Sequence, residues 1–514
     1  MIARLRSWQE SLQAFMHPRV LTMLVFGIMA GLPLLLIFST LSLWLGEVGI
    51  AKSDITYFSW AALGYSFKFV WAPLVDVMPL PVLTRWLGRR RAWLLLAQCM
   101  VMGSIIFMAM VDPAQHSLVW MGAAAVCLGF SSATQDIVTD AYRIESANAE
   151  LQAMMSASYI AGYRIGMLLA GGGALFLASY FGTSIDHYNF EAWQLTYWAM
   201  ASLFLVGILT TLIIDEPKQQ QASALINRRH HVRFFMTFLL AVSAFICSFA
   251  LTADLTALAK QKLGLLLSNA QLVSVFIELI RLVFAGVAAA LVALLMTQIK
   301  FIDKQSVTHS YIAPIQDFFT RYGWSLAWLL LALVGLYRIS DIVLGVVANP
   351  LYQSLGFTKN EIATVVKTFG VFMTIFGAFY GGVLVLRYGV MPILMLGAVL
   401  SAITNLLFML LVQSGHDITM LYVVITADNL SGGLANAAFI AFLSSLTNIS
   451  FTAVQYAIFS SLMTLIPKVL GGYSGSMVES IGFENFFLMT ALMGIPVLLL
   501  IALARKRFNL THPQ

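Results

Sequence analysis

The chain has 514 residues, of which 60% are hydrophobic and only 10% charged, and its mean hydropathy is +0.87. This composition excludes a soluble protein with an ordinary core and indicates a membrane protein that crosses the bilayer many times. We attribute the net charge of +6 to loops that face anionic lipid rather than to nucleic-acid binding.

The first half of the chain contains six apolar runs, each long enough to cross about 30 Å of hydrocarbon as a helix. Polarity does not alternate along these runs, which excludes the strands of a membrane β-barrel. The first run is too long for the core of a signal peptide, so we expect it to be retained. The six predicted spans lie near residues 20–45, 55–78, 92–111, 117–142, 151–181 and 193–214.

Eight further spans are predicted, which gives fourteen in all. Two of these spans, near residues 233–259 and 270–299, form an insertion between the halves. After the insertion, aromatic and isoleucine side chains recur at helical spacing, which is typical of an amphipathic helix on the inner membrane surface; they are Tyr311, Ile312, Ile315, Phe318, Phe319 and Tyr322. The last six spans lie near residues 325–348, 361–386, 390–412, 418–446, 451–470 and 484–504.

The distribution of Lys and Arg predicts the orientation of the spans. If the N-terminus is cytoplasmic, nineteen of the 29 basic residues fall on the inner side, and only Lys52, Lys260, Lys262 and Lys359 fall outside. Such an excess of positive charge marks cytoplasmic loops. We therefore predict that both termini are cytoplasmic.

An internal repeat divides the chain into two similar halves. The segment from Gly49 to Ile55 matches the segment from Gly356 to Ile362, in the loop after the first span of each half. Farther along, five small residues recur 300 positions later. They are Ala153, Ala157, Gly171, Gly172 and Gly182, matched by Ala453, Ala457, Gly471, Gly472 and Gly482. Two parallel halves of six spans favour the major facilitator fold, with an even number of inserted helices preserving the orientation.

The predicted organisation is therefore an all-α polytopic protein of two six-helix bundles. Residues 1–215 form the first bundle, 216–324 a linker with two extra spans and the interfacial helix, and 325–514 the second bundle. Pairs of glycines four residues apart are predicted to let helices pack closely; they are Gly27 and Gly31, Gly162 and Gly166, and Gly377 and Gly381. The three cysteines lie far apart within predicted spans, so neither a disulfide framework nor a metal site is expected, and no cofactor is predicted.

Charged residues inside the apolar spans are the strongest functional signal. A base at the centre of a span costs roughly 2.5 to 3.5 kcal/mol to insert, so these side chains are expected to face inward and serve a function. The bases are Lys68, Arg164, Arg281, Arg338, Lys367 and Lys468, and the acids are Asp136, Asp140, Asp254, Glu278, Asp341 and Asp428. They predict a polar cavity that handles anions. Glu278 and Arg281 are three residues apart on an inserted span, which favours mutual neutralisation.

The loop after the second span carries an acid followed by a basic turn. Asp76 precedes Arg85, Gly88, Arg89, Arg90 and Arg91. This loop resembles the signature of the major facilitator superfamily. The resemblance implies that Asp76, Arg89, Arg90 and Arg91 form a gate, a latch of salt bridges between the two halves at the cytoplasmic face. A simple positive-inside anchor would explain the same arginines.

Several longer motifs resemble the AmpG-type muropeptide permeases over most of the chain. In the first half they are Gly31-Leu32-Pro33-Leu34, the segment from Phe67 to Asp76, Gly88 to Arg91, Ser131 to Ala141 and Gly162 to Met167. In the second half they are Tyr337 to Asp341, Lys367 to Gly370, Tyr380 to Gly382 and Asp428 to Gly433. The resemblance implies a secondary transporter that uses the proton gradient to import 1,6-anhydro-muropeptides, products of cell-wall turnover, from the periplasm. The central position of the insertion departs from some relatives, which carry extra spans at the C-terminus.

An anionic glycopeptide needs cations for its carboxylates, which the mid-span bases can supply. The candidate substrate-binding residues are Lys68, Gln135, Asp136, Arg164, Arg338, Lys367, Asp428, Asn429 and Lys468. Asp136 and Asp140 share one helix face and are the candidate proton carriers, because buried carboxylates can load and release protons. Asp140 could equally bridge to the arginines of the gate. Arg338 and Asp341 could form a structural pair or a substrate contact.

Other functions fit the sequence less well. No zinc-protease motif, nucleophile elbow or phosphate loop is present, so an enzyme is not predicted. Duplicated halves with scattered charges suit alternating access better than a channel. The runner-up is a carrier of acetyl-CoA or another organic anion from the same superfamily. The expected partners are an anionic glycopeptide, protons and membrane lipid, with no nucleic acid, and the chain is expected to function as a monomer.

Overall fold

The computed structural model describes residues 16–50, 65, 67–115, 118–184, 187–217, 228–266, 270–358, 361–471 and 473–511. Within these ranges the chain is helical, apart from an isolated bridge between Ser184 and His187 and the connecting turns. Thirteen helices of the described residues are long and apolar enough to cross a membrane. The predicted all-α class is thus confirmed, while the start of the predicted second span, at 55–64, lies outside the described residues.

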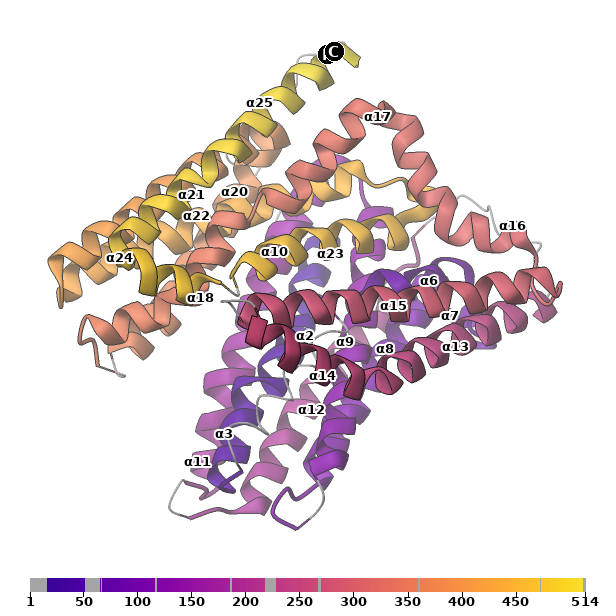
Figure 1. Cartoon of the computed structure of the whole chain (residues 1–514), viewed down its shortest axis with the longest axis horizontal. Helices are drawn as coiled ribbons and strands as arrows, with labels where there is room; N and C mark the ends of the chain where they lie inside the picture. The colour runs from indigo at the N-terminus through magenta and orange to yellow at the C-terminus, as the bar shows by residue number, and fades with distance from the viewer. Residues whose placement is uncertain are drawn as a thin grey trace. The chain divides into compact units, whose positions relative to one another are not determined.

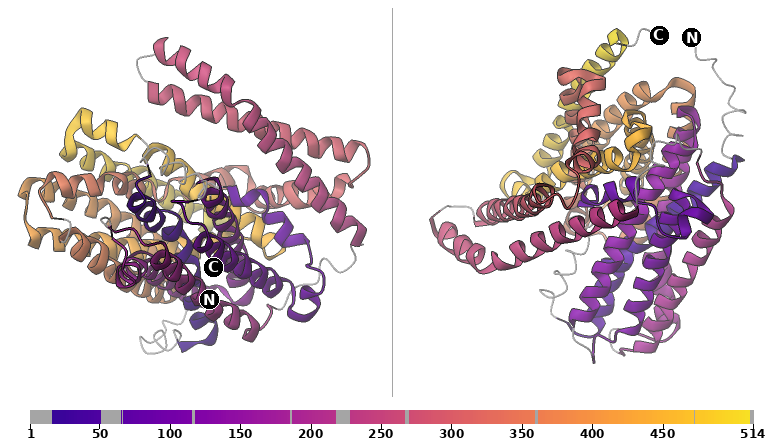
Figure 2. Two further views of the ribbon diagram at one scale, coloured as in Figure 1. Left: turned by 90° about the horizontal axis from the view of Figure 1, so that it is seen from below. Right: turned by 90° about the vertical axis from the view of Figure 1, so that its right-hand side faces the viewer.

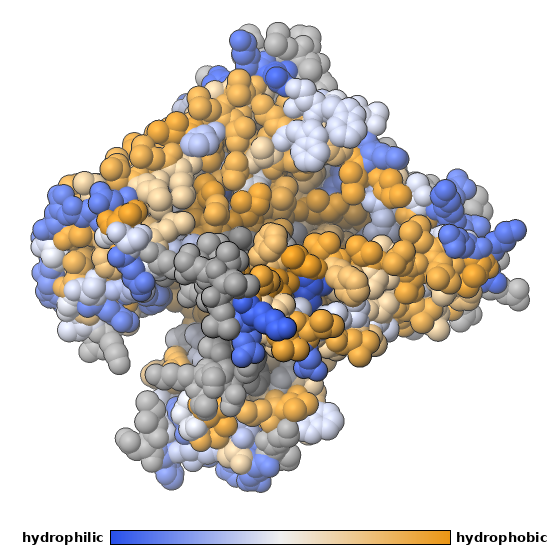
Figure 3. Space-filling model, in the orientation of Figure 1, coloured by the Kyte–Doolittle hydropathy of each residue, from blue (hydrophilic) through white to orange (hydrophobic). Residues whose placement is uncertain are grey.

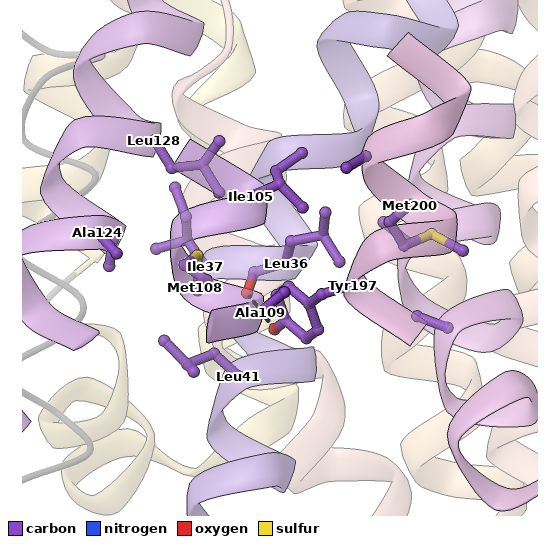
Figure 4. Close-up of a cluster of buried hydrophobic side chains, with 14 of the residues drawn as sticks. Leu36, Ile37, Leu41, Ile105, Met108, Ala109, Ala124, Leu128, Tyr197 and Met200 are labelled. Carbon is purple, nitrogen blue, oxygen red and sulfur yellow. Dashed lines mark hydrogen bonds between the residues drawn. The ribbon is translucent and has the colours of Figure 1, made fainter. Parts of the chain in front are cut away.

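The first six-helix bundle is built around an apolar core. Its elements are α2 (Pro18–Ile37), α3 (Ser39–Glu47), η3 (Lys68–Val70), α6 (Ala72–Val77), α7 (Leu83–Leu87), α8 (Arg89–Met110), α9 (Leu118–Ser146), α10 (Ala149–Leu168), η4 (Leu169–Gly173), α11 (Ala174–Tyr180) and α12 (Phe190–Ile213). Leu36, Ile105, Leu128 and Met200 meet in the core between four of these helices, and the hydroxyl of Tyr197 donates to the carbonyl of Leu36 at 3.0 Å (Figure 4). The buried hydroxyl of Tyr197 is therefore hydrogen-bonded, as buried polar groups usually are.

The second bundle follows the insertion. Its elements are α17 (Ala313–Leu336), α18 (Ile339–Ser354), η6 (Ile362–Phe369), α20 (Gly370–Tyr388), α21 (Val390–Ser414), α22 (Ile418–Leu446), η7 (Ile449–Phe451), α23 (Thr452–Gly471), α24 (Ser474–Leu492) and α25 (Gly494–Thr511), as Figure 1 shows for the α-helices. Apolar side chains cover most of the face seen in Figure 3, as helices that face lipid require.

Two predicted elements of the second half differ in detail. The aromatic segment before the predicted span 325–348 is helical, but it continues into α17 with a kink at Gly323, where φ is 69°. Its Phe318 is buried against Phe459 at a ring distance of 5.2 Å, while Ile312 and Ile315 are exposed. The predicted span 325–348 is divided between α17 and α18 by a turn beside Arg338.

The insertion forms its own compact unit, residues 220–317, separate from the unit formed by residues 1–219 and 318–514. It contains α13 (Arg228–Leu251), α14 (Ala253–Leu266), α15 (Ala270–Gln298), α16 (Lys304–Val307), η5 (Thr308–Ile312) and the first turn of α17. The long helices α13 and α15 run side by side (Figure 2). The predicted single span 233–259 is wrong in detail, because a turn at Thr252 divides it into α13 and α14.

The charges of the insertion neutralise one another, as predicted for Glu278 and Arg281. Arg281 Nη1 lies 3.3 Å from Glu278 Oε2, and Lys260 Nζ lies 2.6 Å from Glu278 Oε1. Arg281 also donates to the carbonyl oxygen of Phe249 near the end of α13, at 2.6 Å from Nη2. One carboxylate thus holds two cations and ties α14 to α15.

Replacing Glu278 by alanine is expected to loosen the insertion. Lys260 and Arg281 would lose their shared carboxylate, and because Glu278 is about a third exposed the cost is only about 1 kcal/mol. Limited proteolysis in detergent should then cut the insertion faster, with Lys262→Ala, in the same helix as Lys260, as the control. Equal cleavage of the two variants would contradict the expectation.

The internal repeat is visible in the backbone. Gly49 and Gly356, matched in the sequence, both have φ of 84°, a conformation that glycine adopts without strain. Arg19 donates to the carbonyl of Ser146, and Arg321 donates to the carbonyl of Leu446 at 3.2 Å. In each half the arginine thus ties the start of the first span to the end of the fourth.

The glycine pairs mark the closest helix contacts. A Cβ added at Gly31 would lie 2.1 Å from the carbonyl oxygen of Tyr163, and one at Gly162 would lie 2.1 Å from that of Leu24. In the second half, a Cβ at Gly377 would lie 2.1 Å from the carbonyl oxygen of Leu430. The predicted packing role is therefore confirmed for α2 against α10 and for α20 against α22.

Candidate functional site

The two bundles meet along a few helices. α10 packs against α20 and α22, and α23 packs against α9, α6 and η3. Ala157 and Ile160 of α10 form a buried apolar cluster with Ala378 of α20 and Ala437 of α22. A Cβ added at Gly382 would lie 2.6 Å from the Cβ of Ala157. The halves are therefore in tight contact at this interface.

Asp76 joins the two halves beside this interface. Its Oδ1 accepts from the backbone N–H of Ala453 at 3.2 Å, and its Oδ2 accepts from that of Val454 at 3.0 Å. These donors belong to the first turn of α23, where backbone N–H groups lack partners within the helix and favour a negative charge. Arg90 Nη2 lies 2.7 Å from Asp76 Oδ1 and holds the carboxylate in place. Asp76 is thus a cap that crosses from the first half to the second.

The arginines of the predicted latch bind mainly within the first half. Arg90 pairs with Asp76 and Glu145, and Arg91 donates through Nε to the carbonyl of Thr211 at 2.9 Å. Arg89 donates to the carbonyl of Asp76. The predicted gate stays a proposal, in which Asp76 crosses to the second half by backbone hydrogen bonds and Arg90 positions Asp76.

Asp76→Ala is expected to weaken this junction more than Arg91→Ala. The first variant leaves two N–H groups of α23 without an acceptor and takes one of two carboxylates from Arg90, which keeps Glu145, whereas the second removes only contacts to α12. Each buried donor left without an acceptor costs about 1 to 3 kcal/mol. The melting temperature of the purified protein in detergent should fall clearly further for Asp76→Ala, and the opposite order would contradict this role.

A second polar group lies where η3, α9, α10, α22 and α23 meet. Lys68 Nζ lies 3.8 Å from Asp140 Oδ2, and Arg143 Nη2 lies 3.1 Å from Asp140 Oδ1. Arg143 Nη1 donates to Ser156 Oγ at 2.9 Å and to Ser444 Oγ at 2.7 Å, the latter in the second half. Asp140 therefore pairs with Lys68 and Arg143, while Asp76 takes the contact with Arg90.

Asp136 and Gln135 lie one turn from Asp140. Asp136 Oδ1 accepts weakly from the hydroxyl of Tyr159 at 3.4 Å. Gln135 is 1% exposed, and among the described residues neither its amide oxygen nor its amide nitrogen has a hydrogen-bond partner. A buried amide without partners is costly, so this position favours a polar ligand or water.

The third group brings the two halves together around arginines. Arg164 of α10 is half-buried and interacts electrostatically with Arg338 and with Asp428 of the second half. Among the described residues it forms no ion pair, and its recorded side-chain contact is to the sulfur of Met167 at 3.9 Å. Arg338 lies 4.0 Å from Asp341, which also accepts from Ser401. Arg164 and Arg338 thus interact across the two halves, with Asp428 and Asp341 as nearby carboxylates. Guanidinium groups from two sides can bind one anion.

The other candidate side chains are placed differently. Asn429 is fixed by Thr374, whose hydroxyl donates to Oδ1 at 2.9 Å, and it donates to the carbonyl of Ile425 at 3.0 Å. Lys367, in the widened π-helical turn η6, and Lys468, which follows Pro467 in α23, are exposed. The structure does not bring these two lysines into contact with the arginine group. Among the described residues no three His, Cys, Asp or Glu side chains gather so that they could hold a metal.

Three residues of the interface were not predicted from the sequence. Arg143 is 0% exposed and reaches the second half, although its position suggested a basic anchor at the inner face. Its spacing of three from Asp140 was the available signal. Glu145 pairs with Arg90, and Glu216 accepts from the backbone N–H groups of Arg90 and Arg91 at 2.8 and 3.0 Å, capping α8.

Comparison with known proteins places these features in a family. The Major Facilitator Superfamily profile matches residues 318–513, and the profile described as acetyl-coenzyme A transporter 1 matches residues 19–214. The structure resembles the proton:xylose symporter XylE, with a TM-score of 0.58 at 13% identity over 98% of this chain and 96% of that one. It also resembles the human organic anion transporter MFSD10, with a TM-score of 0.53 at 12% identity over 96% and 100%. These two likenesses concern the fold.

Two relatives match nearly the whole sequence. The putative transporter AmpG 4 of Rickettsia conorii is 30% identical over 96% of this chain and 98% of its own length. The anhydromuropeptide permease of Escherichia coli K12 is 29% identical over 98% of this chain and 83% of its own length. The two bundles, the repeat and the charged interface accord with these matches, and the chain belongs to the AmpG family of multi-pass membrane transporters within the major facilitator superfamily.

Proposed function

We propose that the protein imports 1,6-anhydro-muropeptides from the periplasm into the cytoplasm, coupled to protons, for reuse of cell-wall material. It would act as a monomer in the inner membrane of a bacterium, with both termini in the cytoplasm. The observation that supports this best is the interaction of Arg164 with Arg338, one from each half, where Arg164 forms no ion pair among the described residues. The name of the Escherichia coli relative supports the cargo.

The chemistry of the cargo suits this pair. A muropeptide carries sugar hydroxyls and several carboxylates, and a guanidinium can hold a carboxylate through two parallel hydrogen bonds. Arg164 and Arg338 belong to different halves, so a carboxylate held between them would be released as the halves move apart. Gln135, with both amide atoms unpartnered, and Asn429, already held by Thr374, would offer hydrogen bonds to sugar or peptide groups. Lys68, Lys367, Asp428 and Lys468 remain candidates for the same cavity.

Uptake into proteoliposomes tests the proposal directly. Purified protein should accumulate labelled anhydro-muropeptide when the gradient drives protons inward, and should only equilibrate it without a gradient. Free coenzyme A should not compete. Competition by coenzyme A, or its transport in place of the muropeptide, would favour the second candidate, an acetyl-CoA carrier, which the profile match over residues 19–214 supports.

Asp136 is proposed as a proton carrier, because it lies inside a span and, within the described part of the chain, accepts a single long hydrogen bond, from Tyr159. Asp136→Asn is expected to reduce proton-driven accumulation about tenfold while leaving exchange of internal for external cargo nearly unchanged. Both rates can be measured in the same proteoliposomes. Accumulation equal to the wild type at every pH would remove Asp136 from coupling and leave Asp140 as the candidate.

A further inference from the structure

Arg143 is the buried charge that touches both halves most directly. Its side chain is 0% exposed and lies on α9 of the first half. Nη1 donates to Ser444 Oγ of α22 at 2.7 Å, and the guanidinium carbon lies 5.1 Å from the ring centre of Tyr456 in α23. Arg143 therefore contacts two helices of the second half at once.

The internal repeat shows that the charged pair of Asp140 and Arg143 is absent from the equivalent positions of the second half. Under the 300-residue offset, Asp140 corresponds to Ile440 and Arg143 corresponds to Leu443, both apolar. Leu443 is buried, so its half is stable at this position without a charge. A buried arginine and its carboxylate cost desolvation energy that an apolar pair would avoid. The charges in the first half are thus an addition to the fold and call for a functional explanation.

We propose that Arg143 is a gating residue, which holds the two halves closed at this interface through Ser444 and Tyr456 and must release them before this end of the transporter opens. Asp140 positions the guanidinium, because its Oδ1 lies 3.1 Å from Arg143 Nη2. Lys68 competes for the same carboxylate, with Nζ 3.8 Å from Oδ2. The other groups that interact electrostatically with Asp140 are Asp136, Tyr159 and Tyr456. A change in the charge of Asp140 would therefore reach the gate through Arg143.

Two serines provide a matched pair for the test. Ser444 and Ser156 both accept from Arg143 Nη1, at 2.7 and 2.9 Å, and each donates to a carbonyl of its own helix. They differ in that Ser444 lies in the second half and Ser156 in the first. Removing either hydroxyl costs Arg143 one hydrogen bond, but only Ser444→Ala removes a bond between the halves.

The readout is the reactivity of a cysteine placed in the closed interface. Ile160 is 7% exposed and belongs to the buried cluster between α10, α20 and α22. In a chain whose Cys99, Cys127 and Cys247 are replaced by serine, Ile160→Cys in lipid nanodiscs should react slowly with a water-soluble maleimide. Ser444→Ala should increase the labelling rate about tenfold, the effect of losing one hydrogen bond to a charged group. Ser156→Ala should stay within about twofold of the parent.

Two more variants separate gating from misfolding. Ser444→Thr keeps the hydroxyl and should restore slow labelling, and Asp140→Asn should raise labelling by weakening the hold on Arg143. Equal labelling of Ser444→Ala and Ser156→Ala, or no rescue by Ser444→Thr, would overturn the proposal. The inference rests on the proposed transport cycle, but labelling needs no cargo, so failure of muropeptide uptake alone would leave a positive labelling result standing.

Discussion

Arg164→Ala is expected to abolish uptake of an anhydro-muropeptide while the protein still inserts into the membrane. Arg164 forms no ion pair among the described residues, so its loss breaks no salt bridge there. What is lost is the contact with a cargo carboxylate, worth about 3 kcal/mol for a charged hydrogen-bonded group, which corresponds to roughly a 100-fold fall in affinity. Initial uptake rates in proteoliposomes measure this.

The control for Arg164 is Lys262, an exposed base in α14 of the insertion. Lys262→Ala should retain most of the uptake. Arg164→Lys should fall between the wild type and the alanine variant, because an ammonium keeps the charge but loses the two-pronged geometry. Full transport by Arg164→Ala would remove this residue from the binding site.

Gly162→Ala is expected to destabilise the first bundle strongly. The new Cβ would lie 2.1 Å from the carbonyl oxygen of Leu24, far inside van der Waals contact, so α2 and α10 would have to separate. Overpacking of this kind costs about 1 to 3 kcal/mol, and the contact involves backbone on both sides, which cannot rotate away. The melting temperature of the purified protein in detergent should therefore drop by several degrees.

Gly122→Ala is the control for this substitution. Gly122 also lies within a membrane-spanning helix, α9, but a Cβ added there meets no atom within 4 Å. Alanine also has the better helix propensity, so Gly122→Ala should leave stability unchanged or raise it slightly. Equal destabilisation by the two substitutions would show that the close approach of α2 and α10 is not what stabilises the bundle.

The spans could be predicted from the sequence because apolar length alone decides what crosses a bilayer. The breaks within them could not, because hydropathy continues through the turns at Thr252 and Arg338 and through the kink at Gly323. The repeat and the glycine pairs were readable because they depend on residue identity at fixed spacing. The junction of Asp76 with α23 was not, because its partners are backbone N–H groups 377 and 378 residues away.

The mid-span charges also separate into pairs that sequence spacing predicts and groups that only the folded chain shows. Spacing along a helix predicted the pair of Glu278 and Arg281 correctly, since residues three apart on a helix are neighbours. The grouping of Arg164 with Arg338 across the halves depends on tertiary packing, which spacing does not encode. Arg143 was placed with the basic anchors because it follows an apolar span, and its burial against Ser444 became visible only in the folded chain.

The central claim is that arginines from both halves line one anion site, and a double-mutant cycle on cargo binding tests it most directly. Affinity for an anhydro-muropeptide should be measured by calorimetry for the wild type, Arg164→Ala, Arg338→Ala and the double variant. If both side chains hold the same carboxylate group, each single variant should bind at least about tenfold more weakly, and the double variant should lose less than the product of the two losses. Wild-type affinity in both single variants would contradict the account.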